Sequence, residues 1–254
     1  MSLNVAASSP RMSNAEWAVR VDLAACYRLA ALFGWDDLIF THMTARVPGT
    51  ADYLINPMGL MFDEVEASNL IRITPEGEVV EDKTGLGYNV AGFVIHGAVH
   101  EARPDVACVT HLHPLAGVAV SCQEDGLLPL SQAALILDVA YHDYEGLALD
   151  MDERERLTAH LGQRNHMIMR NHGLLTCGAT VGGAFLNLFD LQRACEIQLA
   201  AQAGGARLAF PIQAVRSRLS QQIKPPYDLS ALTERLAWPA LLRRLDQVDQ
   251  TYKQ

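Results

Sequence analysis

Two histidines, His111 and His113, stand at alternate positions at the end of the apolar run 106–112. If this run is a β-strand, successive side chains point to opposite faces, so the two imidazoles lie side by side on one face. A third histidine, His172, follows a second apolar run at 167–169. Three neutral imidazoles that leave a coordination position open are a common set of ligands for a catalytic divalent metal. The spacing therefore indicates a metal-dependent enzyme.

The histidine pair has a second interpretation, in which both side chains lie on a solvated strand face. Pro114 directly follows the pair and ends the apolar run, which places the imidazoles at the mouth of a buried strand, where they need partners. Two other metal folds with this spacing do not fit. A metallo-β-lactamase-like site needs an aspartate where Leu115 stands, and a cupin needs a glutamate near Gly117 and Val118.

The composition limits the partners and the compartment. The chain has 254 residues, 29 of them acidic and 20 basic, with a net charge of −9, so we expect no nucleic-acid partner. The five cysteines include no Cys-x-x-Cys pair, which favours a reducing compartment. Residues 1–12 do not resemble a secretory signal, and no apolar run approaches the length of a membrane span. We therefore expect a cytoplasmic protein without a membrane partner.

Capping residues and apolar periodicity predict the elements that position the histidines. We expect helices at 13–34, 90–102, 152–161 and 180–203, and strands at 38–47, 53–56, 70–74, 78–80, 106–113, 134–139, 167–169 and 174–176. Residues 204–226 are expected to be extended or loop, followed by a helical piece interrupted at Trp238 and Pro239. Helices before, between and after closely spaced short strands indicate an α/β layered domain with a mainly antiparallel sheet.

Three further motifs stand in a characteristic order, at 102–106, 110–113 and 170–176. With them the chain resembles the class II aldolase/adducin family from about residue 14 to the C-terminus. The segments 56–60, 62–68 and 238–242 resemble its adducin-related branch. The resemblance implies a three-layer α/β/α single domain, commonly in a homotetramer with active sites at subunit interfaces. We assign 1–12 as a flexible N-terminus, 13–203 as the family domain, and 204–254 as an extension that packs on the domain or on a neighbouring subunit.

The resemblance also implies roles for individual residues. His111, His113 and His172 correspond to the ligands of a divalent metal, which in the family is usually zinc and sometimes manganese. Met58 and Gly59 are the candidate contacts for a small-molecule substrate. We expect His96 and Asn171 to hold the metal ligands in position without binding the metal themselves.

The chain departs from the sugar-phosphate aldolases of the family, such as fuculose-phosphate aldolase. In those enzymes two serines bind phosphate and an acidic residue transfers protons, at positions that correspond here to Val90, Ala91 and Gly92. An asparagine of the phosphate loop corresponds to His42. A dianionic phosphate without such donors would lose its hydration without replacement, which is costly. We therefore expect a substrate without phosphate.

Three more histidines have two interpretations each. His42 is either a structural residue that caps the turn or a catalytic residue that faces the metal as a proton donor or substrate ligand, since its free pKa lies near neutrality. His96 and His100 are four residues apart and share a helix face, where they either pack or support the metal site.

These observations together predict a divalent-metal-dependent lyase. The reaction would be aldol cleavage or decarboxylation of a small carbonyl or carboxylate substrate through a metal-stabilised enolate. Loss of CO2 forms an enolate without prior removal of a proton, so the missing acidic residue favours decarboxylation or a pre-activated substrate. The alternative is a non-catalytic adducin-like binding or assembly protein. A pure scaffold has no reason to keep three metal ligands, so the histidine triad favours the enzyme.

Overall fold

The computed structural model describes residues 12–146, 152–222 and 229–254, so the predicted flexible segment 1–12 lies almost wholly outside the described residues. The helices are α1 (Asn14–Leu32), α2 (Val90–Ala102), α3 (Leu115–Ser121), α4 (Gln132–Leu135), α5 (Glu153–Leu161), α6 (Val181–Gln202), α7 (Gln213–Gln222) and α8 (Leu229–Asp246). The strands are β1 (His42–Arg46), β2 (Tyr53–Ile55), β3 (Ile71–Ile73), β4 (Val79–Glu81), β5 (Cys108–Leu112), β6 (Val139–His142), β7 (His166–Met169) and β8 (Gly173–Gly178). Three short 3-10 helices are η1 (Phe62–Glu64), η2 (Ala203–Gly205) and η3 (Thr251–Lys253).

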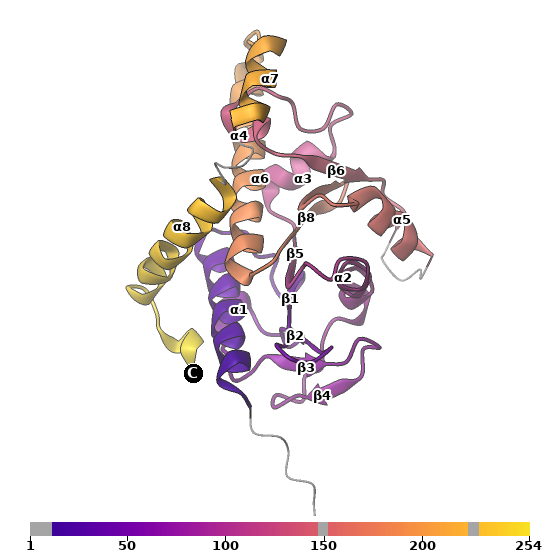
Figure 1. The fold of residues 1–254 in the computed structure, drawn as a ribbon, viewed down its shortest axis with the longest axis vertical. Coiled ribbons are helices and arrows are strands. Elements are labelled where there is room, and N and C mark those ends of the chain that lie inside the picture. Colours follow the sequence, from indigo (N-terminus) through magenta and orange to yellow (C-terminus); the bar gives the residue numbers. More distant parts are fainter. Residues whose placement is uncertain (1–11, 147–151, 223–228) are drawn as a thin grey trace, which may run out of the picture.

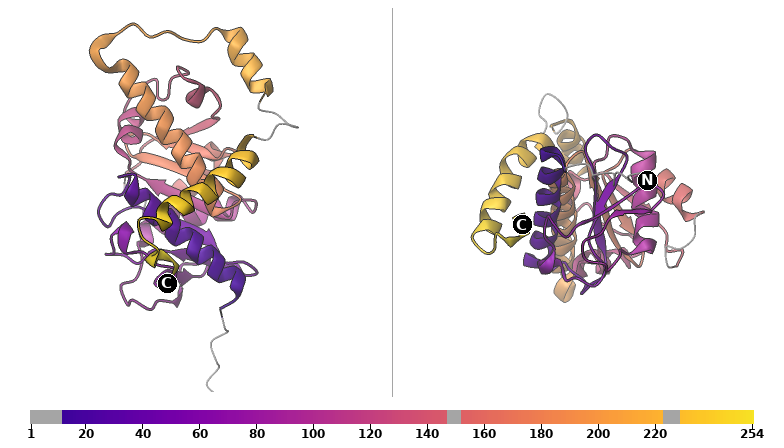
Figure 2. Two further views of the ribbon diagram at one scale, coloured as in Figure 1. Left: turned by 90° about the vertical axis from the view of Figure 1, so that its left-hand side faces the viewer. Right: turned by 90° about the horizontal axis from the view of Figure 1, so that it is seen from below.

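The strands form one eight-stranded sheet in the order β4-β3-β2-β1-β5-β8-β7-β6. Neighbouring strands are antiparallel, except that β6 and β7 run parallel. Helices α1 and α6 cover one face of the sheet, with α8 packed outside them, and α2 and α5 cover the other (Figures 1 and 2). The predicted α/β fold with a mainly antiparallel sheet is confirmed.

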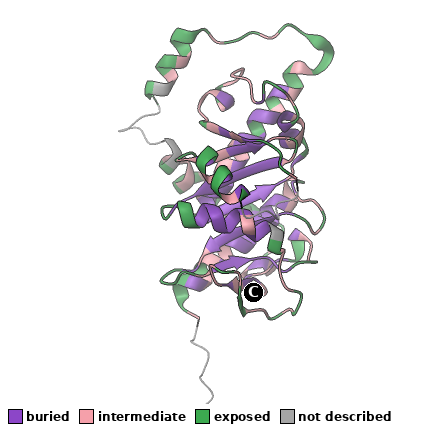
Figure 3. Cartoon of the chain, turned by 90° about the vertical axis from the view of Figure 1, so that its right-hand side faces the viewer, coloured by how far each residue is buried: buried purple, intermediate pink, exposed green. Residues whose placement is uncertain are grey.

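The central strand β5 is buried along its whole length, and its side chains alternate between two cores. Cys108 and Leu112 belong to the core beneath α1 and α6, whereas Val109 packs in the core with residues of α2 and α5. The alternation puts His111 on the α2 side, as the sequence pattern predicts. Buried residues are concentrated in the sheet and the helix faces that touch it, whereas α7 is largely exposed (Figure 3).

The predicted starts of α1 and α6 are confirmed by their caps. The Ser13 side chain accepts a hydrogen bond from the Glu16 backbone N–H, and the Thr180 side chain accepts one from Gly183. Each cap satisfies a backbone donor that the first turn leaves without a partner.

Three predictions of local structure are wrong. Most of the expected strand at 134–139 is replaced by α4, whose first turn is capped by the Ser131 hydroxyl, and β6 begins only at Val139. The expected loop at 204–226 contains α7. Helix α8 continues through Pro239, although proline disfavours helix interiors. The neighbouring Trp238 is buried against Gly182, and this tertiary packing outweighs the local preference.

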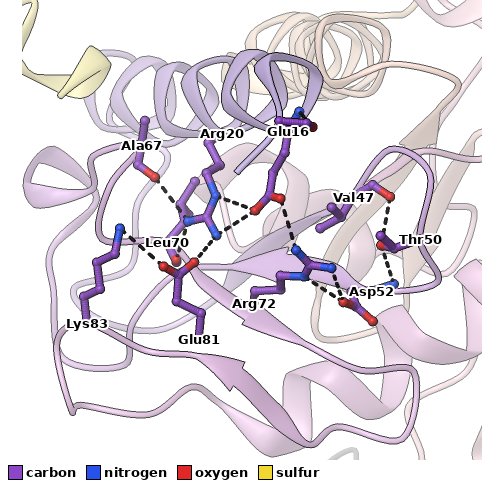
Figure 4. Close-up of polar contacts among 11 residues, drawn as sticks. Glu16, Arg20, Val47, Thr50, Asp52, Ala67, Leu70, Arg72, Glu81 and Lys83 are labelled. Carbon is purple, nitrogen blue, oxygen red and sulfur yellow. Dashed lines mark hydrogen bonds and ion pairs between the residues drawn. The ribbon is translucent and has the colours of Figure 1, made fainter. Parts of the chain in front are cut away.

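An ion-pair network fastens α1 to the strands below it (Figure 4). Arg20 is fully buried and pairs with Glu16 and with Glu81 of β4, at 3.0 and 2.6 Å. Glu16 also pairs with Arg72 of β3, whose other partner is Asp52. The network therefore joins α1 to strands β3 and β4.

Among the described residues, no helix is long and apolar enough to cross a membrane.

Candidate metal site

Strand pairing brings the three histidines of the triad to one end of the sheet. His113 follows the last residue of β5, and His172 lies in the turn between β7 and β8. Strand β8 pairs with β5 in a register that sets Leu174 opposite Leu112. The turn with His172 therefore lies beside the end of β5. On the other side, β1 pairs with β5 and sets His42 directly opposite His111.

The triad has the geometry of a metal site. The Nε2 atoms of His111 and His113 lie 3.2 Å apart, close to the separation of about 3.3 Å between two nitrogen ligands of a tetrahedral zinc ion. One ring nitrogen from each of the three histidines can be chosen so that all lie within 4.8 Å of one another. The structure thus brings together the three residues that the sequence singles out.

The ring orientations suit metal binding as well. The Nδ1 atom of His111 lies 3.1 Å from the carbonyl oxygen of Leu174, and that of His113 lies 3.0 Å from a carboxylate oxygen of Asp37. In each pair Nδ1–H donates to the oxygen, so the lone pair of Nε2 faces the site. This is the tautomer that a metal ligand needs.

Burial favours the neutral form of His111 and His172, which is the form of histidine that coordinates a metal. Desolvation, with the neighbouring imidazoles, lowers the pKa of His111 well below its usual value. Desolvation and then His113 lower the pKa of His172 to about 4. Three imidazole ligands suit zinc or another transition metal better than magnesium or calcium, which prefer oxygen ligands. The residues present therefore fit a divalent metal.

The triad faces a cavity of about 400 Å³, within the range of small-molecule sites. Thr41 and Asn171 line it, and both have positive φ, at 66° and 54°. Such strained backbone is rare outside glycine and is concentrated at functional sites. The complete described lining is Asp37, Phe40, Thr41, His42, Asn89, Gly92, Ile95, His111, His113, Tyr144, Gly146, Asn171 and His172.

His42 lies in the cavity wall with 3% of its surface exposed, and neither ring nitrogen has a hydrogen-bond partner. Burial lowers its pKa to about 4, so the ring is neutral. A Cβ atom on Gly92 would lie only 2.1 Å from Cε1 of this ring. The imidazole thus occupies the space that a side chain at position 92 would need, and the glycine is what allows it to lie there.

Asn171 and His96, the two residues predicted to support the metal ligands, lie in different surroundings. Asn171 adopts the left-handed conformation that asparagine tolerates, immediately before His172. Its backbone N–H donates to the carbonyl of Ser121, which anchors the turn. His96 is fully buried and stacks near His42, with ring centroids 4.2 Å apart, and its Nδ1 contacts the hydroxyl of Thr44. No hydrogen bond joins His96 to a triad ligand among the described contacts.

The predicted substrate contacts, Met58 and Gly59, lie apart from the triad. They occupy a turn after β2, where the Met58 N–H donates to the carbonyl of Gly87 and 41% of Met58 is exposed. They are not among the described residues that line the cavity, and their role stays a prediction.

Sequence reasoning missed Asp37, which holds His113, and Tyr144, whose ring centroid lies 6.1 Å from that of His172. Asp37 stands in the segment between α1 and β1, where paired aspartates are typical of a turn. No spacing rule connects this position with a histidine 76 residues away. The partnership arises only when β1 and β5 pair.

Asp37 yields a first prediction. Replacing it with alanine is expected to weaken zinc binding by about 10- to 100-fold, because a carboxylate behind a ligating histidine fixes its tautomer and raises its basicity. Affinity would be measured by competition with a zinc chelator. Asp36→Ala is the control, since it removes the neighbouring carboxylate, which does not line the cavity. Equal affinities for the two variants would contradict the role of Asp37.

The fold and site define an α/β protein with a three-histidine site at the end of its central strand. A family model for the Class II Aldolase and Adducin N-terminal domain matches residues 21–199, and the chain belongs to this family. The resemblance carried by the sequence motifs is thereby confirmed.

Individual relatives cover the chain to different extents. A protein of Pseudomonas aeruginosa that is provisionally named an aldolase class 2 protein is 53% identical over 96% of this chain and 95% of its own length. The crystal structure of an aldolase II superfamily protein from Pseudomonas syringae is 50% identical, with a TM-score of 0.91 over 96% of this chain and 98% of that chain. Mouse alpha-adducin is 48% identical over 74% of this chain but only 26% of its own length.

Proposed function

We propose that the protein is a divalent-metal-dependent lyase that acts on a small carbonyl or carboxylate substrate without phosphate, by aldol cleavage or decarboxylation. The observation that carries the proposal is the triad itself, with Nε2 of His111 and His113 turned inward at the wall of a 400 Å³ cavity. The metal would be zinc or manganese. When bound, it would supply Lewis-acid stabilisation of the negative charge that develops on a substrate oxygen as a carbon–carbon bond breaks.

The cavity wall supports a substrate without phosphate. Its described lining contains no lysine or arginine, the side chains that pair with phosphate. It does contain two buried polar groups without a hydrogen-bond partner, the hydroxyl of Thr41 and the imidazole of His42. Such groups are costly to bury alone and can bind the oxygens of a carboxylate or a carbonyl. His42, by this proposal, is the catalytic residue nearest to the triad.

The second candidate function is assembly, as an adducin-like binding protein. The 48% identity to alpha-adducin over 193 residues favours it. The inward lone pairs and the Asp37 support of His113 favour the enzyme, because assembly does not need oriented imidazoles.

We also propose that the protein is a cytoplasmic homo-oligomer, a tetramer in accordance with its family. All five cysteines are free and four of them are buried, which suits a reducing compartment.

The experiment measures metal content and enolate chemistry together. Purified protein should contain about one zinc or manganese per chain, by elemental analysis. The loaded protein would be incubated with pyruvate in D2O, where NMR follows exchange of the methyl protons, and with oxaloacetate, where release of CO2 is followed. We expect metal binding and turnover of at least one probe. Protein that binds no metal, with all three histidines intact, would overturn the proposal and favour assembly.

A further inference from the structure

The ring of His172 is held differently from the rings of the other two metal ligands. The Nδ1 atoms of His111 and His113 each pair with an oxygen of the chain. Within the described part of the chain, no hydrogen bond holds the ring of His172. The place of this ring relative to the other two therefore depends on the backbone turn 170–172, which joins β7 to β8.

Arg170 holds this turn from outside the cavity. Its backbone N–H donates to the carbonyl of His142 at 2.7 Å, and Nη1 of its guanidinium donates to the carbonyl of Gln123 at 2.6 Å. The guanidinium carbon lies 4.5 Å from the centroid of the Tyr141 ring. A charged donor bonds a carbonyl more strongly than a neutral one, and a cation over an aromatic ring adds to the attraction. Arg170 thus ties the turn to β6 and to the segment that follows α3.

Gln198 of α6 holds the segment that receives Arg170. Its side chain is buried, with 1% of the residue exposed. Nε2 of Gln198 donates to Oε1 of Gln123 at 2.6 Å and to the carbonyl of Gly126 at 2.8 Å. Its Oε1 accepts from the backbone N–H of Leu128 at 2.6 Å. A buried amide needs these partners, and all three bonds form only while the segment 123–128 keeps its shape.

The turn lies tightly against the other two ligands. A Cβ atom on Gly173, the residue after His172, would lie 2.7 Å from Cδ2 of His113 and 2.7 Å from the carbonyl oxygen of Leu112. The ring centroid of His172 lies 4.7 Å from that of His111 and 4.8 Å from that of His113. Ligand distances in a metal site are defined to about 0.2 Å, so a small shift of the turn would take His172 away from the metal.

We propose that Arg170 and Gln198 are positioning residues of the metal site, which fix His172 through the turn that carries it. The inference rests on the proposed function in one respect, that the triad binds a metal. Arg170 acts on the turn directly, and Gln198 acts through the segment 123–128 and Arg170. Neither side chain is among the described residues that line the cavity. The C-terminal half of α6 is thereby coupled to a metal ligand that it does not contact.

The central variant is Arg170→Met, which keeps the unbranched stem and removes the guanidinium. Zinc affinity, measured by competition with a chelator, is expected to fall by about 10- to 100-fold, the usual effect of losing a residue that supports a ligand. The matched control is Arg46→Met, at the end of β1 away from His42. The guanidinium of Arg46 likewise bonds a carbonyl, that of Val106 at 2.8 Å, and lies 5.4 Å from the Tyr53 ring centroid. Equal zinc affinities for the two variants would overturn the proposal.

A spectrum of the bound metal separates positioning from a general loss of stability. With cobalt in place of zinc, the visible absorption reports how the triad coordinates the metal. Arg170→Met should weaken the absorption of four-coordinate cobalt, because His172 no longer stays in place, whereas Arg46→Met should leave it unchanged. Arg170→Lys keeps a charged donor for the carbonyl of Gln123 and should recover part of the lost affinity. An unchanged cobalt spectrum in Arg170→Met would overturn the role of Arg170.

A double-variant cycle tests whether Gln198 acts through Arg170. Gln198→Leu has a similar volume and lacks the amide, so it should also lower zinc affinity. If its effect passes through the segment 123–128 to Arg170, adding it to Arg170→Met should lower the affinity little further. Losses that add in full, as they do for independent sites, would overturn the coupling of α6 to the metal site.

A measurement on the metal-free protein separates this inference from the proposed function. The backbone N–H of His172 donates to the carbonyl of Met169 at 3.2 Å, and NMR can follow its hydrogen exchange. Arg170→Met should speed this exchange by about 10-fold, the effect of one lost hydrogen bond to a charged group, and Arg46→Met should not. Unchanged exchange in Arg170→Met would overturn the positioning role. Faster exchange and weaker zinc binding, in a protein that turns over neither pyruvate nor oxaloacetate, would support that role and count against the lyase.

Discussion

Replacing His113 with alanine is expected to abolish stable zinc binding and, with it, any lyase activity. The site would keep two of its three metal ligands. Loss of a residue that only hydrogen-bonds a ligand lowers metal affinity by about 10- to 100-fold, and loss of the ligand itself should lower the zinc affinity by more than that. His113 is the best ligand to remove, because 25% of its side chain is exposed, whereas His111 is almost fully buried. The fold of the metal-free variant should therefore stay close to that of the metal-free wild type.

Thermal unfolding with and without zinc measures this effect. Zinc at 1,000 times its dissociation constant should raise the free energy of unfolding of the wild type by about 4 kcal/mol, because only the folded state offers the assembled site. His113→Ala should show no such increase. His160→Ala is the control, since it removes an exposed histidine of α5 and leaves the triad intact. A zinc-dependent increase of wild-type size in His113→Ala would show that the triad is not the binding site.

The metal ligands could be predicted from the sequence because each depends on a local pattern. Alternation along β5 fixes the face of His111 and His113 relative to Cys108 and Leu112, whatever the rest of the fold. The motif around His172 adds the third ligand. Asp37 could not be found in this way, since its contact with His113 depends on how α1, the following turn and β5 pack together.

Two departures from the family pattern prove to be one structural feature. In the sequence, histidine at position 42 and glycine at position 92 are separate substitutions. In the structure the His42 ring fills the space beside Gly92, so that any side chain there would collide with it. An acidic side chain at position 92 would therefore compete with the imidazole for one place in the cavity wall. Sequence spacing alone cannot show this, because the two positions meet only when α2 packs over β1.

The largest expected effect on stability comes from Arg20, far from the metal. Its guanidinium is fully buried and bonds Glu16, Glu81 and the carbonyl oxygens of Ala67 and Leu70. Arg20→Met fills much of the same volume but leaves these acceptors without their donor. Removing one partner of a buried ion pair typically lowers the free energy of unfolding by about 3 to 5 kcal/mol. We expect a loss of that size, measured by urea unfolding of the metal-free protein.

Arg154→Met is the matched control, because it removes the same charged group from an exposed pair with Glu101. That variant should lose less than about 1 kcal/mol, since water screens exposed pairs. Arg20→Lys should lie between the two, as it keeps the charge without the planar fork of donors. If Arg20→Met and Arg154→Met unfold at the same urea concentration, the network does not hold α1 to the sheet. In that case the apolar contacts of Leu23, Tyr27 and Leu29 hold α1 to the sheet without it.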